Sequence, residues 1–199
     1  MAGAVAVTAL TALWTIWLPY TKGMVCRQLF PLIYQDFYVD EEGNKLQQNR
    51  FFGLENGDIL ITGATHFLGY RHGHAALVVD AAHGVTLEAF CVGTVSGFDS
   101  LDKWYFYPET RVLRLKAERK QREQIAAFAR EKLAGIPYRL TAVTIGERKK
   151  DGAYRGTQCA HLIWLAYREF GYDVDGTGGW LVTPMDLLRS EWLEEVKQD

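Results

Sequence analysis

Hydrophobic and polar positions divide the chain into three parts. Residues 2–20 carry no charged side chain and end in a segment rich in Trp and Tyr. At ~1.5 Å per helical residue this stretch spans about 30 Å, the thickness of the hydrocarbon core of a bilayer. We therefore predict an N-terminal apolar helix within residues 1–39, either a membrane anchor or a signal-like segment, with a buried core helix as the alternative. The polar residues 40–53 are predicted to form a linker, and residues 54–199 a folded domain.

Short apolar runs bounded by turn residues predict strands in the first half of this domain. Residues 74–79 and 85–90 are rich in β-branched and apolar side chains, and residues 80–84 between them are typical of a hairpin loop. A turn precedes a further short apolar run at 59–61, and residues 111–115 alternate as a half-buried strand does.

Helical periodicity marks the second half of the domain. Residues 117–134 and 157–170 are predicted helices that end near glycine, and a short helix is predicted after Pro184. Because the strands come early and the helices late, the pattern predicts an α+β fold instead of an alternating parallel sheet. The apolar stripe of the first helix consists of Ile125, Phe128, Ala129 and Leu133.

Composition and charge exclude several classes of function. The chain has 199 residues, with 22 Lys and Arg against 24 Asp and Glu, which gives a formal net charge of −2. A domain that neutralises nucleic-acid phosphates carries a basic excess, so we expect no nucleic-acid partner. Three scattered cysteines without a C-x-x-C pair argue against a disulfide scaffold and a zinc site. We therefore predict neither a metal nor a cofactor, and the oligomeric state stays open.

Cys159 lies at the start of the second predicted helix, a position that favours nucleophilic chemistry. The N–H groups and the dipole at a helix N-terminus stabilise a thiolate, and the same N–H groups can hold the oxyanion formed by attack on a carbonyl. The cysteine also shares an apolar stripe with Leu162, Ile163 and Ala166, which is the pattern of an inert core cysteine. A suitably placed histidine would decide between these interpretations.

His74 and Glu88 lie on the two strands of the predicted hairpin. A register centred near residue 81 places them opposite each other, and any even register keeps them on one face. A carboxylate on one ring nitrogen fixes the tautomer and supports the imidazolium, which leaves the other nitrogen for Cys159. His72 is an alternative base on the same face. The other histidines, at positions 66, 83 and 161, are expected in loops or on solvent-facing surfaces.

Five motifs occur in a defined order between residues 54 and 193. They are GDIL at 57–60, GHAALV at 73–78, GIPY at 135–138, CAHLI at 159–163 and TPMDLL at 183–188. This ordered set resembles the permuted papain-like enzymes of the NlpC/P60 superfamily, and within them the YiiX/YaeF-type amidases of peptidase family C92. In that permuted branch the histidine strand precedes the cysteine helix, as it does here.

The resemblance implies a circularly permuted papain-like fold in which an antiparallel sheet packs against the cysteine-bearing helix. It implies that Cys159 is the nucleophile, that His74 is the general base and later the acid, and that Glu88 orients His74. By the same resemblance, Tyr138 shapes the substrate and oxyanion region. Residues 139–141 (RLT) replace the Trp-Gly-Gly that commonly follows this tyrosine in cell-wall peptidases.

The expected function is that of a cysteine hydrolase, an amidase or peptidase that works through an acyl-enzyme. Its expected substrate is a small peptide of the cell envelope, another amide or an acyl ester. Two alternatives remain: a lipid or acyl-chain transferase using the same site, with which the aromatic run 104–107 is compatible, and a catalytically silent binding domain tethered to a membrane. The apolar N-terminal segment makes a membrane the expected partner and predicts membrane association or a bacterial cell-envelope location.

Overall fold

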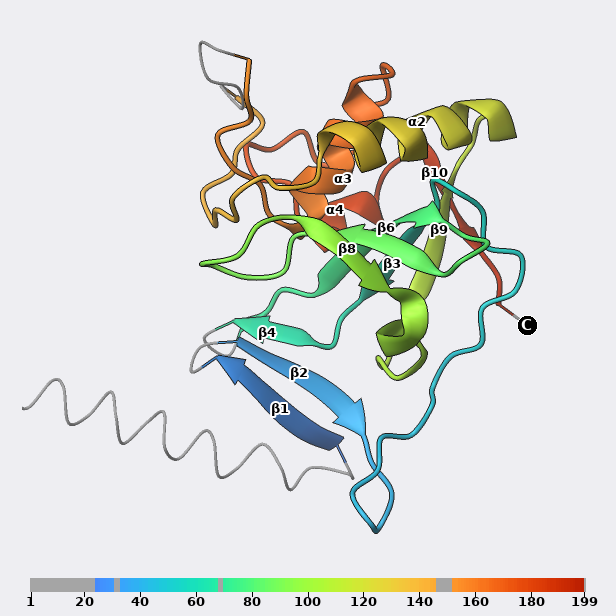
Figure 1. The fold of residues 1–199 in the computed structure, drawn as a ribbon, viewed down its shortest axis with the longest axis vertical. Helices are drawn as coiled ribbons and strands as arrows, with labels where there is room; N and C mark the ends of the chain where they lie inside the picture. The colour runs from blue at the N-terminus through green and yellow to red at the C-terminus, as the bar shows by residue number, and fades with distance from the viewer. Residues whose placement is uncertain (1–23, 31–32, 68–69, 146–151, 199) are drawn as a thin grey trace, which may run out of the picture.

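Strands fill the first half of the chain and helices lie mainly in the second, as Figure 1 shows for this computed structural model. The structure describes residues 24–30, 33–67, 70–145 and 152–198. The elements are β1 (Met24–Phe30), β2 (Ile33–Tyr38), β3 (Ile59–Thr62), β4 (Thr65–Phe67), β5 (Tyr70–Arg71), β6 (His74–Asp80), β7 (Val85–Glu88), β8 (Gly97–Ser100), the 3-10 helix η2 (Leu101–Tyr105), β9 (Arg111–Leu115), α2 (Arg119–Lys132), α3 (Cys159–Arg168), α4 (Pro184–Leu187) and β10 (Leu193–Val196).

The strands form two antiparallel sheets. The larger sheet has the strand order β10-β9-β3-β6-β7-β8, and the smaller sheet has the order β1-β2-β4-β5. β6 is a central strand of the larger sheet because it pairs with β3 on one side and β7 on the other. The predicted hairpin is confirmed as β6 and β7, and the predicted strand at 111–115 is confirmed as β9. Together with the helices, these sheets confirm the α+β class.

Both faces of the larger sheet are covered, which explains the unbroken apolar sequences of its central strands. Side chains alternate along a strand, so a strand that is buried on both faces needs apolar residues at successive positions. Ile59 and Leu77 point to the side where α2 and α3 pack. Leu60 and Val78 point to the opposite side and pack in a second core cluster with Trp104.

Helices α2 and α3 lie on the same side of the larger sheet and both contact β6 (Figure 1). Ile125, Ala129 and Leu133 are fully buried as their stripe predicts, whereas Phe128 is only partly buried. Every residue of α3 from 159 to 167 is buried. A helix enclosed to this extent has little freedom to move, so its first residue is held firmly in place.

The N-terminal part of the described chain differs from the sequence prediction. Met24–Phe30 and Ile33–Tyr38 form the antiparallel strands β1 and β2, and runs such as IYQDFY are rich in residues that favour strands. β2 pairs with β4, so the smaller sheet joins this segment to the domain predicted at 54–199. Residues 2–20, on which the anchor prediction rests, lie outside the described residues. Within the described ranges, no helix combines the length and the apolar character that a membrane crossing requires.

The segment predicted as a linker, residues 40–53, packs against the domain. The side-chain amide of Asn49 donates to the carbonyl oxygens of Trp104 at 2.8 Å and Tyr107 at 2.6 Å. The backbone N–H groups of Gln48 and Asn49 both donate to the carbonyl of Tyr105. These bonds tie the segment to η2 and the residues that follow it, so it does not act as a simple tether.

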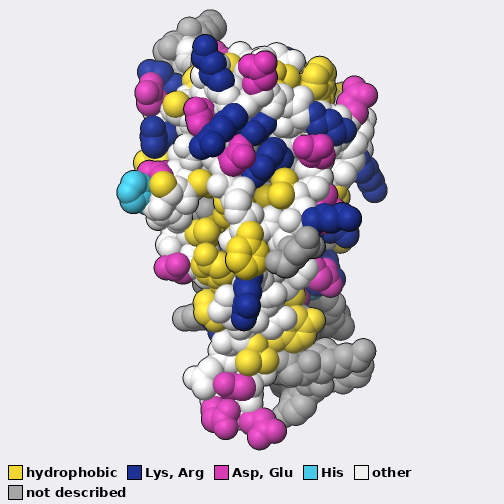
Figure 2. All heavy atoms as spheres, turned by 90° about the vertical axis from the view of Figure 1, so that its right-hand side faces the viewer, with side chains coloured by type: hydrophobic (Ala, Val, Ile, Leu, Met, Phe, Trp, Pro, Cys, Tyr) yellow, Lys and Arg dark blue, Asp and Glu magenta, His cyan; other side chains and the backbone are white. Residues whose placement is uncertain are grey.

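Charged side chains of both signs are interspersed on the face that Figure 2 shows. Basic and acidic groups alternate over the upper part of this view, and hydrophobic side chains lie between them and below. Such a mixed distribution agrees with the small net charge of −2.

Candidate active site

Cys159 is the first residue of α3, and the preceding residue fixes where that helix begins. The Gln158 side-chain oxygen accepts a hydrogen bond from the backbone N–H of Ala160 at 2.9 Å, so Gln158 is the N-cap. The side-chain nitrogen of Gln158 donates to the carbonyl of Val182, which anchors the cap to the segment before α4. Cys159 itself is 4% exposed, and its sulfur lies 3.5 Å from the Gln158 side-chain oxygen.

A Gln158→Ala variant is expected to lose about 1–2 kcal/mol of unfolding free energy, because it removes the helix cap and leaves the Val182 carbonyl without this donor. Urea denaturation followed by circular dichroism would measure the loss. Gln47→Ala is the matched control, since Gln47 is exposed, and it should change stability by less than about 0.5 kcal/mol. A Gln158→Ala variant as stable as the native chain would show that the cap contributes nothing.

His74 is the first residue of β6 and is only 2% exposed. Its Nε2 lies 2.6 Å from Oε2 of Glu88. The imidazole stacks on Trp104 with a centroid distance of 5.6 Å, and the edge contact with Phe90 has a centroid distance of 5.2 Å. Cys159 lies close enough to His74 to raise the pKa of the imidazole. Because Glu88 occupies Nε2, Nδ1 is the ring nitrogen left for the sulfur.

The carboxylate of Glu88 accepts hydrogen bonds from four side chains. His74 Nε2 and the ammonium of Lys103 bind Oε2 at 2.6 and 2.8 Å. The indole N–H of Trp104 and the hydroxyl of Thr86 bind Oε1 at 3.0 and 2.6 Å. A buried carboxylate is tolerated only when its oxygens are satisfied in this way, and the four donors hold it in one orientation.

The register of the hairpin explains how His74 and Glu88 meet. β6 and β7 pair Leu77 with Leu87 and Val78 with Thr86, and an irregularity follows near Asp80. The pairing is therefore shifted by one residue on each strand from the predicted one, and Glu88 lies diagonal to His74. Because the shift is even, both side chains stay on the same face and remain within reach.

The electrostatics of the site favour an ionised pair. Burial alone would lower the pKa of His74, but its hydrogen bonds to Cys159 and Glu88 outweigh burial and raise the pKa to about 9. Burial would raise the pKa of Glu88, but His74 and Lys103 outweigh it and lower the pKa to about 2. At neutral pH Glu88 is therefore a carboxylate and His74 an imidazolium.

Tyr138 and Cys159 line the same cleft, which has a volume of about 210 Å³. The backbone N–H of Tyr138 donates to the carbonyl of Thr94, and Tyr138 forms a parallel bridge with Thr157, two residues before the cysteine. Burial, with Cys159 and Cys91 nearby, raises the pKa of the Tyr138 phenol. The structure thus brings together all four residues that the sequence singles out.

The remaining histidines divide into different environments. His72 lines the cleft of Cys159, but burial lowers its pKa to about 4 and the Glu88 carboxylate binds His74. His83 lies on a turn and is exposed, as expected. The expectation of a loop or solvent-facing position is wrong for His161, which is fully buried in α3 and stacks on Trp164, because that helix is enclosed on nearly all sides. It is also wrong for His66, which lies in β4 and binds Asp36 at 2.5 Å.

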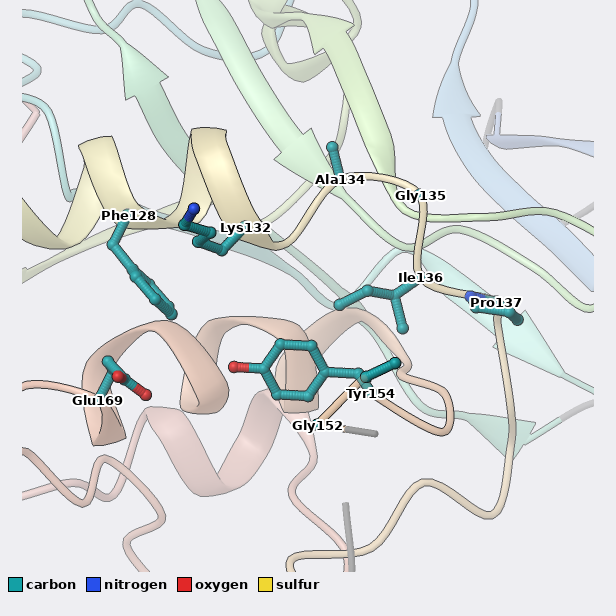
Figure 3. Close-up of a pocket in the computed structure, with 10 residues that line it drawn as sticks. Phe128, Lys132, Ala134, Gly135, Ile136, Pro137, Gly152, Tyr154 and Glu169 are labelled. Atoms are coloured by element: carbon teal, nitrogen blue, oxygen red, sulfur yellow. The ribbon is translucent and has the colours of Figure 1, made fainter. Parts of the chain in front are cut away.

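A larger hollow of about 610 Å³ lies apart from these residues. Figure 3 shows Phe128 and Lys132 extending from α2, with Tyr154 and Glu169 on the opposite wall. Cys159 does not line this hollow. The smaller cleft is therefore the candidate site, because Cys159 lines it.

A Cys, a His and a Glu in contact could also hold a metal ion, but this donor set does not fit one. Both oxygens of Glu88 already receive hydrogens from other side chains, and the ammonium of Lys103 stands where a cation would bind Oε2. Among the described residues, no group of three or more His, Cys, Asp or Glu side chains is arranged to hold a metal.

The comparisons with known proteins bear on the fold. No family model and no curated protein matches the sequence. Among solved structures, the metalloprotein YiiX from Escherichia coli O157:H7 aligns with a TM-score of 0.55 at 14% identity, over 74% of this chain and 99% of the YiiX chain. A likeness at this level of identity concerns the course of the backbone and not the chemistry. The chain therefore has a YiiX-like fold.

Proposed function

We propose that this chain is a cysteine hydrolase, an amidase or peptidase of the permuted papain-like (NlpC/P60) type. Cys159 is its nucleophile, His74 its general base and later its acid, and Glu88 the group that orients His74. The observation that carries the proposal is the series in which Cys159 raises the pKa of the neighbouring His74, and His74 binds a carboxylate that has four donors. Such a nucleophile, base and orienting group in series is the arrangement that covalent acyl transfer requires.

In the first half of the reaction the sulfur of Cys159 attacks the carbonyl carbon of the substrate. At neutral pH the imidazolium of His74 already carries the thiol proton on Nδ1, so the thiolate of Cys159 forms the C–S bond and the electron pair of the C=O bond moves to the oxygen, which becomes negative. The N–H of Cys159 is at the first helical position, where no acceptor exists within the helix, so it is placed to stabilise that oxygen. Tyr138 borders the same space and limits how the substrate lies.

In the second half the C–N or C–O bond breaks as His74 returns its proton to the leaving group. A water molecule then loses a proton to His74 and attacks the thioester, which releases the acid and regenerates the thiol. Glu88 remains ionised throughout because its pKa is about 2, and it stabilises each imidazolium that forms. If another acyl acceptor replaces water, the same steps give an acyltransferase.

Selective alkylation at low pH tests whether Cys159 is activated. A free cysteine with a pKa of ~8.5 is only about 0.3% thiolate at pH 6. We expect iodoacetamide at pH 6 to label Cys159 on the order of 100-fold faster than Cys91 or Cys26, with peptide mass spectrometry locating the label. His74→Ala should remove this preference, because the imidazole no longer takes the thiol proton.

The second variant His74→Gln keeps a polar side chain of similar size at the buried position. Circular dichroism of both variants shows whether the fold is intact, and retained folding with lost labelling supports the proposal. Equal labelling of the three cysteines in the native chain, or labelling of Cys159 that is unaffected by both variants, would instead favour a catalytically silent binding domain.

A further inference from the structure

The ammonium of Lys103 shares one oxygen of Glu88 with the imidazole of His74. Lys103 Nζ binds Oε2 of Glu88 at 2.8 Å, and His74 Nε2 binds the same oxygen at 2.6 Å. On its other side Lys103 Nζ binds Oδ2 of Asp99 at 2.5 Å. Asp99 is exposed, the side chain of Lys103 is 24% exposed, and Glu88 is buried. Positive and negative groups therefore alternate from the surface to the buried imidazole.

Lys103 keeps its positive charge in this environment. Burial alone would lower its pKa, but Glu88 and Asp99 outweigh burial and raise the pKa above the usual 10.5. Burial, and then the negative charge of Glu88, raises the pKa of the Tyr107 phenol, so that group stays neutral. Among the described residues, Lys103 and His74 are thus the cations that contact the Glu88 carboxylate.

The 3-10 helix η2 is held in place by groups other than the Lys103 ammonium. The hydroxyl of Ser100 accepts a hydrogen bond from the backbone N–H of Asp102 at 3.1 Å and caps the first turn. Trp104 is fully buried and donates to Glu88 from its indole nitrogen. Taking an ammonium group largely out of water costs free energy. Because η2 is anchored without this charge, we attribute the lysine to its effect on the Glu88 carboxylate.

This effect matters most while His74 is neutral, which is its state in the acyl-enzyme. His74 has then given its Nδ1 proton to the leaving group and keeps its Nε2 proton toward Glu88. Its free Nδ1 takes the proton of the attacking water. Cys159 is at that point an uncharged thioester, and His72 adds no charge because burial lowers its pKa to about 4.

Glu88 is most easily protonated in the same state. It has lost the charge of the imidazolium, and burial favours the neutral carboxyl group. A protonated Glu88 would donate to Nε2 of His74 and leave the imidazole proton on Nδ1, the position that must receive the proton of the water. The ammonium of Lys103 opposes this change, because its charge persists when that of His74 is gone.

We propose that Lys103 is a positioning residue for the reaction: its ammonium keeps Glu88 a carboxylate while His74 is neutral, and thereby keeps the imidazole proton on Nε2. This inference rests on the proposed cysteine hydrolase function and adds a residue that does not line the cleft of Cys159. An opposite charge at this range lowers a carboxyl pKa by about 1–3 units, so losing the ammonium should make the site inactive at a correspondingly higher pH.

The test is the pH dependence of p-nitrophenyl butyrate hydrolysis between pH 3.5 and 8. Attack by Cys159 forms the C–S bond and releases p-nitrophenolate, and water then releases butyrate. Lys103→Met should move the acid limb of kcat upward by about 1–3 pH units, with the rates converging on the native ones toward pH 8. Lys103→Gln is a second neutral variant and should show the same shift. Lys103→Arg should keep the native limb, because the guanidinium carries the same charge.

Lys120→Met is the matched control, because Lys120 is an exposed lysine of α2, and it should keep the native pH profile. Circular dichroism at each pH establishes that the variants are folded. An acid limb that stays in place in both neutral variants, a decrease by the same factor at every pH, or an equal shift in Lys103→Arg overturns the role of Lys103 and leaves the hydrolase intact. No turnover and no butyryl adduct on Cys159 of the native chain overturns the hydrolase as well.

Discussion

Replacing Glu88 with glutamine is expected to slow acyl transfer by roughly 10²–10⁴-fold at pH 7. The carboxylate accepts hydrogen bonds from four side chains and carries the charge that stabilises the His74 imidazolium. The glutamine side chain has only one accepting oxygen. Its NH₂ group would face the donors that bind the second carboxylate oxygen of Glu88 in the native chain. His74 would then lose both its fixed orientation and its electrostatic support. The rate of Cys159 alkylation at pH 6 and the turnover of p-nitrophenyl butyrate would both measure the effect.

Glu123→Gln provides the control, because Glu123 is an exposed residue of α2 that pairs with Arg119. It should leave both rates within about twofold of the native values. A Glu88→Gln variant with native rates would mean that His74 does not depend on Glu88. The variant His72→Asn would then show whether the other histidine of the cleft serves as the base.

Much of the site could be predicted from local pattern. The apolar and β-branched runs at 74–79 and 85–90, separated by turn residues, predict a hairpin. An even register is enough to place His74 and Glu88 on one face, even though the observed partner of His74 lies two positions from the predicted one. The helix that begins at Cys159 is marked by its apolar periodicity. These features depend on residues close together in the chain, where spacing alone determines geometry.

The groups that complete the site come from elements with no such signal. Lys103 and Trp104 lie in η2, a single 3-10 helix, and neither spacing nor composition indicates that both reach Glu88. The run 104–107 is compatible with an acyl-chain transferase by sequence, and in the structure Trp104 and Tyr107 are buried in the core. Thr86 could have been found, because it lies two residues before Glu88 on the same face of a strand.

The pairing of β2 with β4 was also beyond local inference. The backbone pairing of Ile33 with Phe67, more than thirty residues apart in the sequence, is set by how the smaller sheet assembles and not by either segment alone. From local pattern alone, an apolar N-terminal sequence followed by polar residues predicts an anchor and a linker. The tertiary pairing instead incorporates Met24–Phe30 and Ile33–Tyr38 into a sheet.

The His74–Glu88 pair should also give the fold a distinctive dependence on pH. The folded pKa of His74, about 9, lies above its usual 6.5, so its stabilisation is complete below pH 6.5 and is lost as pH rises through about 9. The folded pKa of Glu88, about 2, lies below its usual 4.5, so its stabilisation is present above pH 4.5 and is lost as pH falls through about 2. The pair therefore stabilises the fold most between about pH 4.5 and 6.5. A pKa difference of this size corresponds to on the order of 3 kcal/mol for each residue. The two contributions are not added, because both describe the same interaction between His74 and Glu88.

The double variant His74→Gln/Glu88→Gln isolates this contribution, because it removes both charges and leaves every other titrating group in place. Urea unfolding of the native chain and the double variant between pH 3 and 10 should give a difference in stability that is largest near pH 5–6 and decreases on both sides. Cys159→Ser distinguishes the effect of Cys159 on the pKa of His74 from the effect of Glu88. Without the thiolate, the loss of stability at alkaline pH should begin at a lower pH, whereas the loss of stability at acid pH should not move. A difference that stays constant across this range would show that His74 and Glu88 titrate alike in the folded and unfolded chains. The ionised pair on which acyl transfer depends would then not exist.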